Sequence, residues 1–148
     1  MNINKQLIYN ACLENRKSIA ENAKSAMDDI QQQANEYGPP KDRYDSFRAQ
    51  LLRKRDLFAE QYQNALNDID VLKKIKPESV SLKVEFGSLF RTGKQWMFIA
   101  IGIGKITIDK IDIFVISPAV PVFKAMDGKK AGEYYIFNGK QFGIDEIL

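Results

Sequence analysis

The chain has 148 residues, of which 45% are hydrophobic and 28% are charged, and its formal net charge is +3. This composition excludes a disordered or fibrous chain and allows one ordinary core, or a small core with an extended appendage. The small positive charge is dispersed among nearly as many acidic residues, which argues for a protein partner and against direct binding to nucleic acid.

The residue types that are missing narrow the chemistry further. The chain has no histidine and one cysteine, Cys12. A disulfide framework is therefore excluded, and we expect a reducing, cytoplasmic setting. The lack of histidine disfavours Ser-His and Cys-His mechanisms. The longest apolar stretch, residues 96–103, is too short to cross a bilayer, so we expect a soluble protein with no membrane partner.

The N-terminal part of the chain has the pattern of one long helix. Apolar residues recur at spacings of three, four and seven from Ile3 to Ala34, and neither glycine nor proline interrupts them. At 1.5 Å per residue such a helix would be roughly 45 Å long, too long for a domain of this size to cover on all sides. We therefore expect a second helix along its length.

A seven-residue repeat indicates that second helix and its supercoiling. The residues that follow the repeat are Tyr44, Leu51, Phe58, Ala65 and Leu72. Between the two runs, Tyr37-Gly38-Pro39-Pro40 cannot continue a helix because proline lacks the amide donor. A short connection makes the pair antiparallel. Residues 1–76 are thus predicted to form a coiled-coil helical hairpin whose tip is the stretch from Ala34 to Ser46.

After Lys76-Pro77 the period changes from seven to two. Val80, Leu82, Val84 and Phe86 alternate with polar residues, which predicts a half-buried strand. Further elements are predicted as strands at 95–103 (central) and 111–116, a short helix at 120–126, and a hairpin with strands at 134–137 and 142–147 around Asn138-Gly139. The fold class is therefore α+β, with residues 77–148 as a small antiparallel-sheet domain. We interpret the aromatic residues of this domain, Trp96 included, as core.

The tip carries the main candidate site. Glu36, Asp42 and Asp45 place three carboxylates within a short stretch, and carboxylate oxygens are preferred ligands of Mg²⁺, which takes one or two of them from protein. Two such groups on a rod can complete a metal site inside another protein. The alternative is structural: Asp42 would cap the second helix, and Asp45 would be favoured by the helix dipole in the first turn. We expect no self-contained enzyme and no metal site in the free protein.

Two stretches of the C-terminal half stand out: Val84-Glu85-Phe86-Gly87-Ser88, and Ile116-Ser117-Pro118 followed by the residues from Ala125 to Glu133, AMDGKKAGE. Both resemble the Gre family of bacterial transcription elongation factors, GreA and GreB. The second stretch is similar to the Ser-Pro, Ala-Leu, Gly-Lys-Lys, Gly-Asp pattern of the family in order and spacing. The resemblance covers residues from Val84 onward, and the order of hairpin and sheet domain extends it over the whole chain.

The resemblance implies a fold, a partner and a role for the tip. The C-terminal domain would have an FKBP-like fold and would dock on RNA polymerase, with Ser117 and Pro118 in the docking surface. The hairpin would enter the secondary channel, where Asp42 and Asp45 would act as the acidic pair that helps hold a Mg²⁺ ion shared with the polymerase and promotes transcript cleavage. Contact with DNA or RNA would be indirect, through the polymerase complex.

The tip departs from the family pattern, and three readings follow. The family has Gly-Asp-Leu-Ser-Glu-Asn-Ala-Glu-Tyr, whereas this chain has GPPKDRYD from Gly38 to Asp45, with basic residues on both sides of Asp42 and one two residues before Asp45. The chain is accordingly expected to modulate backtracked or paused complexes, with or without cleavage stimulation. The alternative is a polymerase-binding inhibitor or Rnk-like regulator that stimulates no cleavage. The third reading is an FKBP-like peptidyl-prolyl isomerase with a coiled-coil arm, for which the sequence identifies no aromatic pocket.

Overall fold

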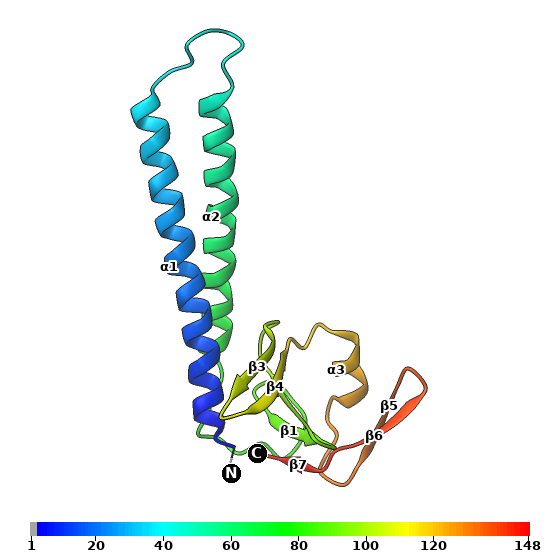
Figure 1. Ribbon diagram of the computed structural model, residues 1–148. Helices are drawn as coiled ribbons and strands as arrows, with labels where there is room; N and C mark the ends of the chain where they lie inside the picture. Colours follow the sequence, from blue (N-terminus) through cyan, green and yellow to red (C-terminus); the bar gives the residue numbers. More distant parts are fainter. Residues whose placement is uncertain (1–2) are drawn as a thin grey trace. The chain divides into compact units, whose positions relative to one another are not determined.

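The computed structural model describes residues 3–148 of the chain (Figure 1). Two compact units are present: Leu13–Asp70 is one, and Met1–Cys12 together with Val71–Leu148 is the other. The first two turns of the N-terminal helix therefore belong with the C-terminal part. The expected boundary after residue 76 falls inside that second unit. No helix in the described part of the chain is long and apolar enough to span a membrane.

The first two elements are long helices, α1 (Lys5–Tyr37) and α2 (Phe47–Leu72), which run side by side in Figure 1. Three contacts between them define an antiparallel register. The Tyr37 and Phe47 rings lie 4.8 Å apart, Arg55 donates a hydrogen bond to Gln31, and Arg16 lies 3.3 Å from Asp68. The predicted antiparallel hairpin is confirmed.

Small side chains dominate the buried seam of this hairpin. Within the unit Leu13–Asp70, the buried residues are Ala20, Ala23, Ile30 and Ala34 on α1 and Ala65 and Ile69 on α2. Of the seven-residue repeat, Ala65 and Leu72 are buried, and Leu51 and Phe58 are half-buried. Tyr44 is 77% exposed because it precedes the start of α2, so its predicted place in the seam is wrong.

The unit that contains Val71–Leu148, named the C-terminal unit, holds a five-stranded sheet of order β3-β4-β2-β1-β7 and a separate two-stranded ribbon, β5-β6. The strands of the sheet are β1 (Leu89–Thr92), β2 (Gln95–Ile99), β3 (Gly104–Ile108), β4 (Ile111–Ile116) and β7 (Glu146–Ile147), and those of the ribbon are β5 (Tyr134–Phe137) and β6 (Lys140–Gly143). The pair β2–β4 is parallel and the other pairs are antiparallel. The α+β fold class is confirmed, with β2 in the centre of the sheet as predicted.

The predicted strand over residues 80–86 is wrong. This segment consists of turns and bends, and the side chains of Val80 and Leu82 are 75% and 81% exposed. Val84 is buried and bonded on both sides: its N–H donates to the Lys129 carbonyl at 2.8 Å, and its own carbonyl accepts from Gly128 at 2.8 Å. These bonds join it to the turn after α3 (Pro121–Met126) rather than to a strand.

Two strands, β1 and β3, do not appear among the sequence predictions. β2 also ends at Ile99, four residues before its predicted end at Ile103, and the chain then turns into β3 at Gly104. The last predicted strand is divided into β6 and β7. The short helix α3, the strand β4 and the Asn138-Gly139 turn are confirmed, and both turn residues have the positive φ that a tight hairpin needs, 52° and 75°.

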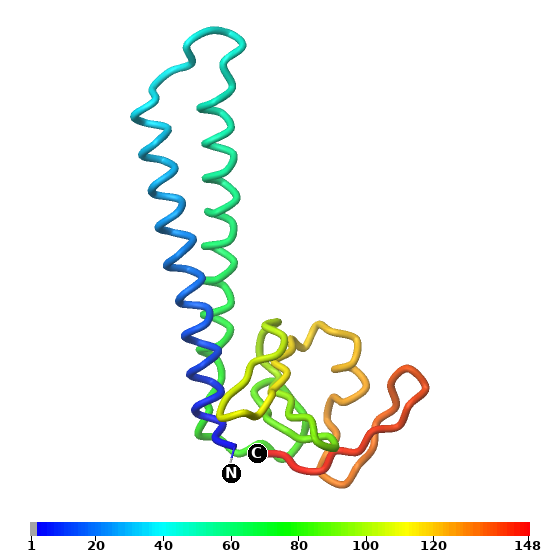
Figure 2. Tube along the Cα trace, in the orientation of Figure 1, coloured from blue at the N-terminus to red at the C-terminus, as the bar shows by residue number. Residues whose placement is uncertain are grey.

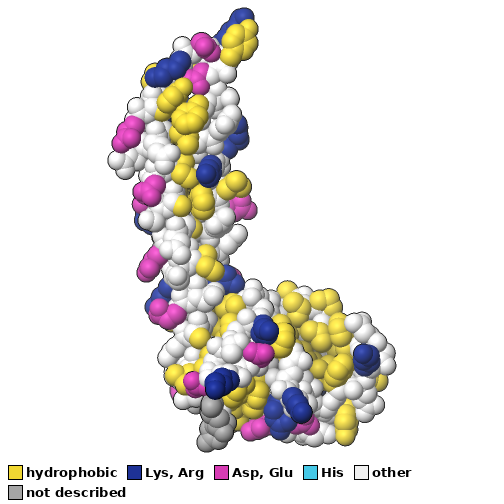
Figure 3. All heavy atoms as spheres, in the orientation of Figure 1, with side chains coloured by type: hydrophobic (Ala, Val, Ile, Leu, Met, Phe, Trp, Pro, Cys, Tyr) yellow, Lys and Arg dark blue, Asp and Glu magenta, His cyan; other side chains and the backbone are white. Residues whose placement is uncertain are grey.

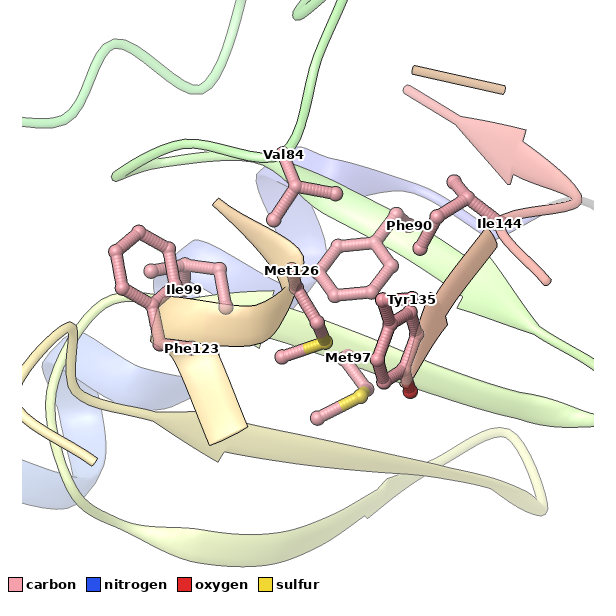
Figure 4. Close-up of a cluster of buried hydrophobic side chains, with 8 residues drawn as sticks. All are labelled: Val84, Phe90, Met97, Ile99, Phe123, Met126, Tyr135 and Ile144. Carbon is pink, nitrogen blue, oxygen red and sulfur yellow. The ribbon is translucent and has the colours of Figure 1, made fainter. Parts of the chain in front are cut away.

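A hydrophobic cluster joins α3 to the sheet and the ribbon (Figure 4). Its buried members are Val84, Phe90, Met97, Ile99, Phe123, Met126, Tyr135 and Ile144. Burying a side chain of this size contributes about 1.5–3 kcal/mol. The cluster therefore fixes the positions of α3 and β5, which carry the candidate surfaces of this unit.

Candidate functional site

Residues 38–46 form the loop that joins α1 to α2, an open turn of the trace in Figure 2. Gly38 ends α1 with a φ of 79°, and its N–H donates to the Ala34 carbonyl at 3.1 Å. A glycine in this left-handed conformation is a common helix terminator, because a side chain there would clash with the backbone. Pro39 and Pro40 follow and prevent the helix from resuming.

Asp45 holds this loop together. Its Oδ2 accepts hydrogen bonds from the Tyr37 hydroxyl and from the Lys41 N–H at 2.8 Å, and its Oδ1 accepts from the Phe47 N–H at 3.1 Å. One carboxylate thus connects the end of α1, the middle of the loop and the start of α2. These bonds, the one from the Lys41 N–H first, hold the pKa of Asp45 below its usual value.

Asp42 occupies a different part of the loop. Its Oδ1 accepts from the Tyr44 N–H at 2.8 Å, and its carbonyl accepts from the Asp45 N–H at 3.2 Å, which together form a tight turn. The helix α2 begins only at Phe47, so the alternative in which Asp42 caps α2 is wrong. Asp45 lies before the helix rather than in its first turn, and supports the helix start through the Phe47 N–H.

The carboxylates of the tip are not gathered into one ligand set. Glu36 accepts from Gln32 one turn earlier on α1, at 3.1 Å. Within residues 3–148, no group of three or more acidic or thiol side chains is placed to hold a metal ion. Asp45 already accepts three hydrogen bonds, whereas a carboxylate offers about four lone-pair sites. Asp42 and Asp45 therefore do not form a ready pair of Mg²⁺ ligands, and their sharing of a metal with a partner remains a prediction.

Two cation–aromatic pairs accompany these carboxylates. The Lys41 Nζ lies 4.7 Å from the centre of the Tyr37 ring and donates to the Tyr37 carbonyl. The Arg43 guanidinium lies 4.8 Å from the centre of the Tyr44 ring and donates to its hydroxyl at 2.6 Å. Figure 3 shows basic and hydrophobic side chains together at this end of the hairpin. The tip therefore presents cationic and aromatic side chains as well as acidic ones.

Ser117 and Pro118 form the turn between β4 and α3. The Ser117 Oγ accepts from the Ala119 N–H at 3.1 Å, and the Ser117 carbonyl accepts from the Val120 N–H at 3.2 Å. Both residues are half-buried. These hydrogen bonds support the start of α3. The place of this turn in a polymerase-docking surface remains a prediction.

The C-terminal unit also has a groove of about 940 Å³ that the sequence did not reveal. The aromatic residues that line it are Trp96, Phe114, Tyr135, Phe137 and Phe142. Tyr135 is buried, as a core residue should be, and Phe142 stacks on it at 5.2 Å. Phe114 and Phe137 are half-buried and pack against the hydrophobic cluster, whereas Trp96 is half-buried and is not part of it, so the interpretation as core is wrong for Trp96. Burial raises the pKa of the Tyr135 hydroxyl.

Comparisons with known proteins give one structural likeness. No family model matches the chain, and no curated protein matches it either. Among solved structures, the crystal structure of GreA factor homolog 1 (Gfh1) of Thermus thermophilus is similar over 92% of this chain and 94% of that chain, at 15% sequence identity and with a TM-score of 0.35. Similarity at this level carries no function from one protein to another.

Proposed function

We propose that the chain is a Gre-like accessory factor of RNA polymerase, which acts by placing its hairpin in the secondary channel. The observation that supports this proposal is a hairpin whose longer helix, α1, has 33 residues and ends in an ordered loop that carries Asp42 and Asp45. The 25 residues of α1 that belong to the hairpin unit, 13–37, extend about 38 Å. A rod of that reach, attached to a small sheet domain, suits a protein that delivers its tip into another protein.

The proposed factor has no chemistry of its own. Its C-terminal unit docks on the polymerase through the turn at Ser117 and Pro118, and nucleic acid is contacted only through the polymerase complex. Any Mg²⁺ at the tip belongs to the polymerase active site. The residues of this chain bind the polymerase, occupy the secondary channel and position the loop.

The loop geometry favours a factor that acts without stimulating cleavage. Asp45 is engaged by Tyr37, Lys41 and Phe47, so it would have to leave this network to bind a metal ion. Lys41 and Arg43 also offset the charge of the two aspartates. An inhibitor or Rnk-like regulator that occupies the channel needs neither carboxylate free. We therefore rank occupancy, in which the hairpin fills the channel without stimulating cleavage, above cleavage stimulation.

Transcript cleavage by the host polymerase in a stalled, backtracked complex tests the proposal. Co-elution with core polymerase comes first, because failure to bind would refute every polymerase reading. The chain is then compared with an Asp42→Ala, Asp45→Ala double variant and with Asp28→Ala, Asp29→Ala, a control that removes the same charge from the exposed surface of α1. If the protein acts by occupying the channel, the control variant should act like the unchanged chain, and the tip variant should lose at most part of the effect because its loop has lost the bonds of Asp45. Stimulation that is lost only in the tip variant would overturn occupancy and establish a cleavage factor.

The isomerase reading gains one specific observation, the aromatic groove of the C-terminal unit. A peptidyl-prolyl isomerase needs an apolar pocket for the proline ring, and Trp96, Phe114 and Phe137 present half-buried ring faces there. Acceleration of proline isomerisation in a short peptide, abolished by Phe137→Ser, would favour this function. No acceleration at high protein concentration would eliminate it.

A further inference from the structure

The groove of the C-terminal unit is built by five parts of the fold. Strands β1, β2 and β4, the helix α3 through Val122, and the β5-β6 ribbon all contribute lining residues. Its apolar floor lies against the hydrophobic cluster, with which it shares Met97 and Tyr135. Figure 3 shows hydrophobic side chains gathered on and beside α3. The floor is therefore supported by the core and exposes the half-buried rings of Trp96 and Phe114.

Two exposed lysines stand on the rim, each on a tight turn. Lys94 follows Gly93, whose φ is 63° and whose N–H donates to Asp145 at 2.6 Å. Lys110 lies in the turn between β3 and β4, with a φ of 66°. Turn geometry fixes both backbones, so both lysine side chains start at the edge of the groove.

The remaining charge of the rim is already offset. Asp112 is the acidic residue among the described residues that line the groove. Its carboxylate accepts from the Thr107 hydroxyl at 2.6 Å and lies 4.0 Å from the Lys105 ammonium. Lys94 and Lys110 outnumber Asp112, so the lining carries a formal charge of +1, and an acidic ligand is the complementary one.

We propose that this groove binds an extended, acidic peptide segment of a partner protein. Side chains of an extended peptide alternate in direction, so one row would pack on the aromatic floor while the other would place carboxylates near Lys94 and Lys110. A nucleic acid strand is a poorer fit, because it needs a line of cations along its backbone. In the described part of the chain, neither the tip loop nor Ser117-Pro118 lines the groove, so this site goes beyond the proposed function.

Trp96 provides the test, because it is the only tryptophan of the chain and lines the groove. The probe is a synthetic peptide in which Glu alternates with Leu and Phe, without proline or tryptophan. We expect a saturable change in Trp96 fluorescence that weakens as salt is added. A peptide with Lys in place of Glu, and one with Ser in place of Leu and Phe, should give no saturable change. Equal binding of either control peptide would refute the proposal.

Substitutions on the rim separate groove binding from general charge attraction. The Lys94→Gln, Lys110→Gln variant should bind the acidic peptide about three- to tenfold more weakly, as expected for two exposed ion pairs. The control, Lys83→Gln with Lys124→Gln, removes the same charge at exposed positions outside the groove and should bind like the unchanged chain.

Charge reversal separates the groove from the net charge of the chain. In Lys94→Glu, Lys110→Glu, preference should pass from the acidic to the basic peptide, whereas Lys83→Glu, Lys124→Glu, which changes the net charge equally outside the groove, should keep the preference for the acidic peptide. Unchanged preference would overturn the proposal. So would tighter binding of a single-stranded oligonucleotide than of the acidic peptide, since the ligand would then be nucleic acid. A requirement for proline in the peptide would likewise assign the groove to the isomerase reading.

Discussion

The segment from residue 80 to residue 86 offers a direct test of the fold, because a strand and the observed turns predict different costs for the same substitutions. Val84 is fully buried, whereas Leu82 is 81% exposed. Val84→Ala removes two carbon groups, worth about 0.8 kcal/mol each, and leaves a cavity, so we expect it to lower the free energy of unfolding by about 2–3 kcal/mol. Leu82→Ala should change it by less than about 0.5 kcal/mol.

Denaturant unfolding followed by Trp96 fluorescence measures both costs in the unit concerned. Val80→Ala, at a position that is 75% exposed, is a second control and should resemble Leu82→Ala. In a half-buried strand, Val80, Leu82 and Val84 would share one buried face. Comparable losses of stability in all three variants would therefore refute the turn structure and restore the strand.

Three further predictions concern single side chains. The hydrogen bonds from the Lys41 N–H and then the Tyr37 hydroxyl hold the pKa of Asp45 below its usual 3.8, so the contribution of Asp45 to loop order is present above pH 3.8 and is lost as the pH falls through the lower folded pKa. Tyr37→Phe should move this loss to higher pH in an NMR titration of the carboxylate. An unchanged titration would contradict the network. Burial lowers the pKa of Lys5 from 10.5, so its proton binds more tightly in the unfolded chain, and the free energy of unfolding should rise as the pH rises from the folded pKa toward 10.5. Lys5→Met should abolish this rise in denaturation curves recorded across that pH range. Gly87 has a φ of 87°, so Gly87→Ala should cost about 1–2 kcal/mol in the same measurement, and a neutral result would argue against the left-handed turn.

The hairpin could be predicted from the sequence because its signals are long and redundant. A repeat sustained over many turns outweighs a single misplaced residue such as Tyr44, and Gly38-Pro39-Pro40 can only interrupt a helix. The loop that follows could not be predicted in the same way. Its form depends on which donors reach Asp45, and Asp42 and Asp45 are both suitable helix caps by residue type. The positions of the donors in space, which the spacing in sequence does not give, determine that Asp45 and not Asp42 supports the start of α2.

The strands of the C-terminal unit show why alternation is a weaker signal. Val80 and Leu82 alternate correctly for a strand but have no neighbouring strand with which to pair, whereas Leu89 to Thr92 is short and pairs on both sides. Strand pairing is a non-local property, and a short window of sequence does not contain it. The groove was missed for the same reason, since its aromatic residues come from strands that are distant in the chain.

The charge of the tip bears on how the hairpin would act inside a partner. The loop from Gly38 to Ser46 contains two basic residues, Lys41 and Arg43, and two acidic residues, Asp42 and Asp45, so its formal charge is zero. A neutral loop gains little from approaching a bound cation, because the attraction of each carboxylate is offset by a nearby positive charge. Asp45, moreover, cannot leave its three donors without disordering the connection between α1 and α2. A loop with these properties is suited to keeping its own shape in a confined channel, which is why the geometry favours occupancy over metal delivery.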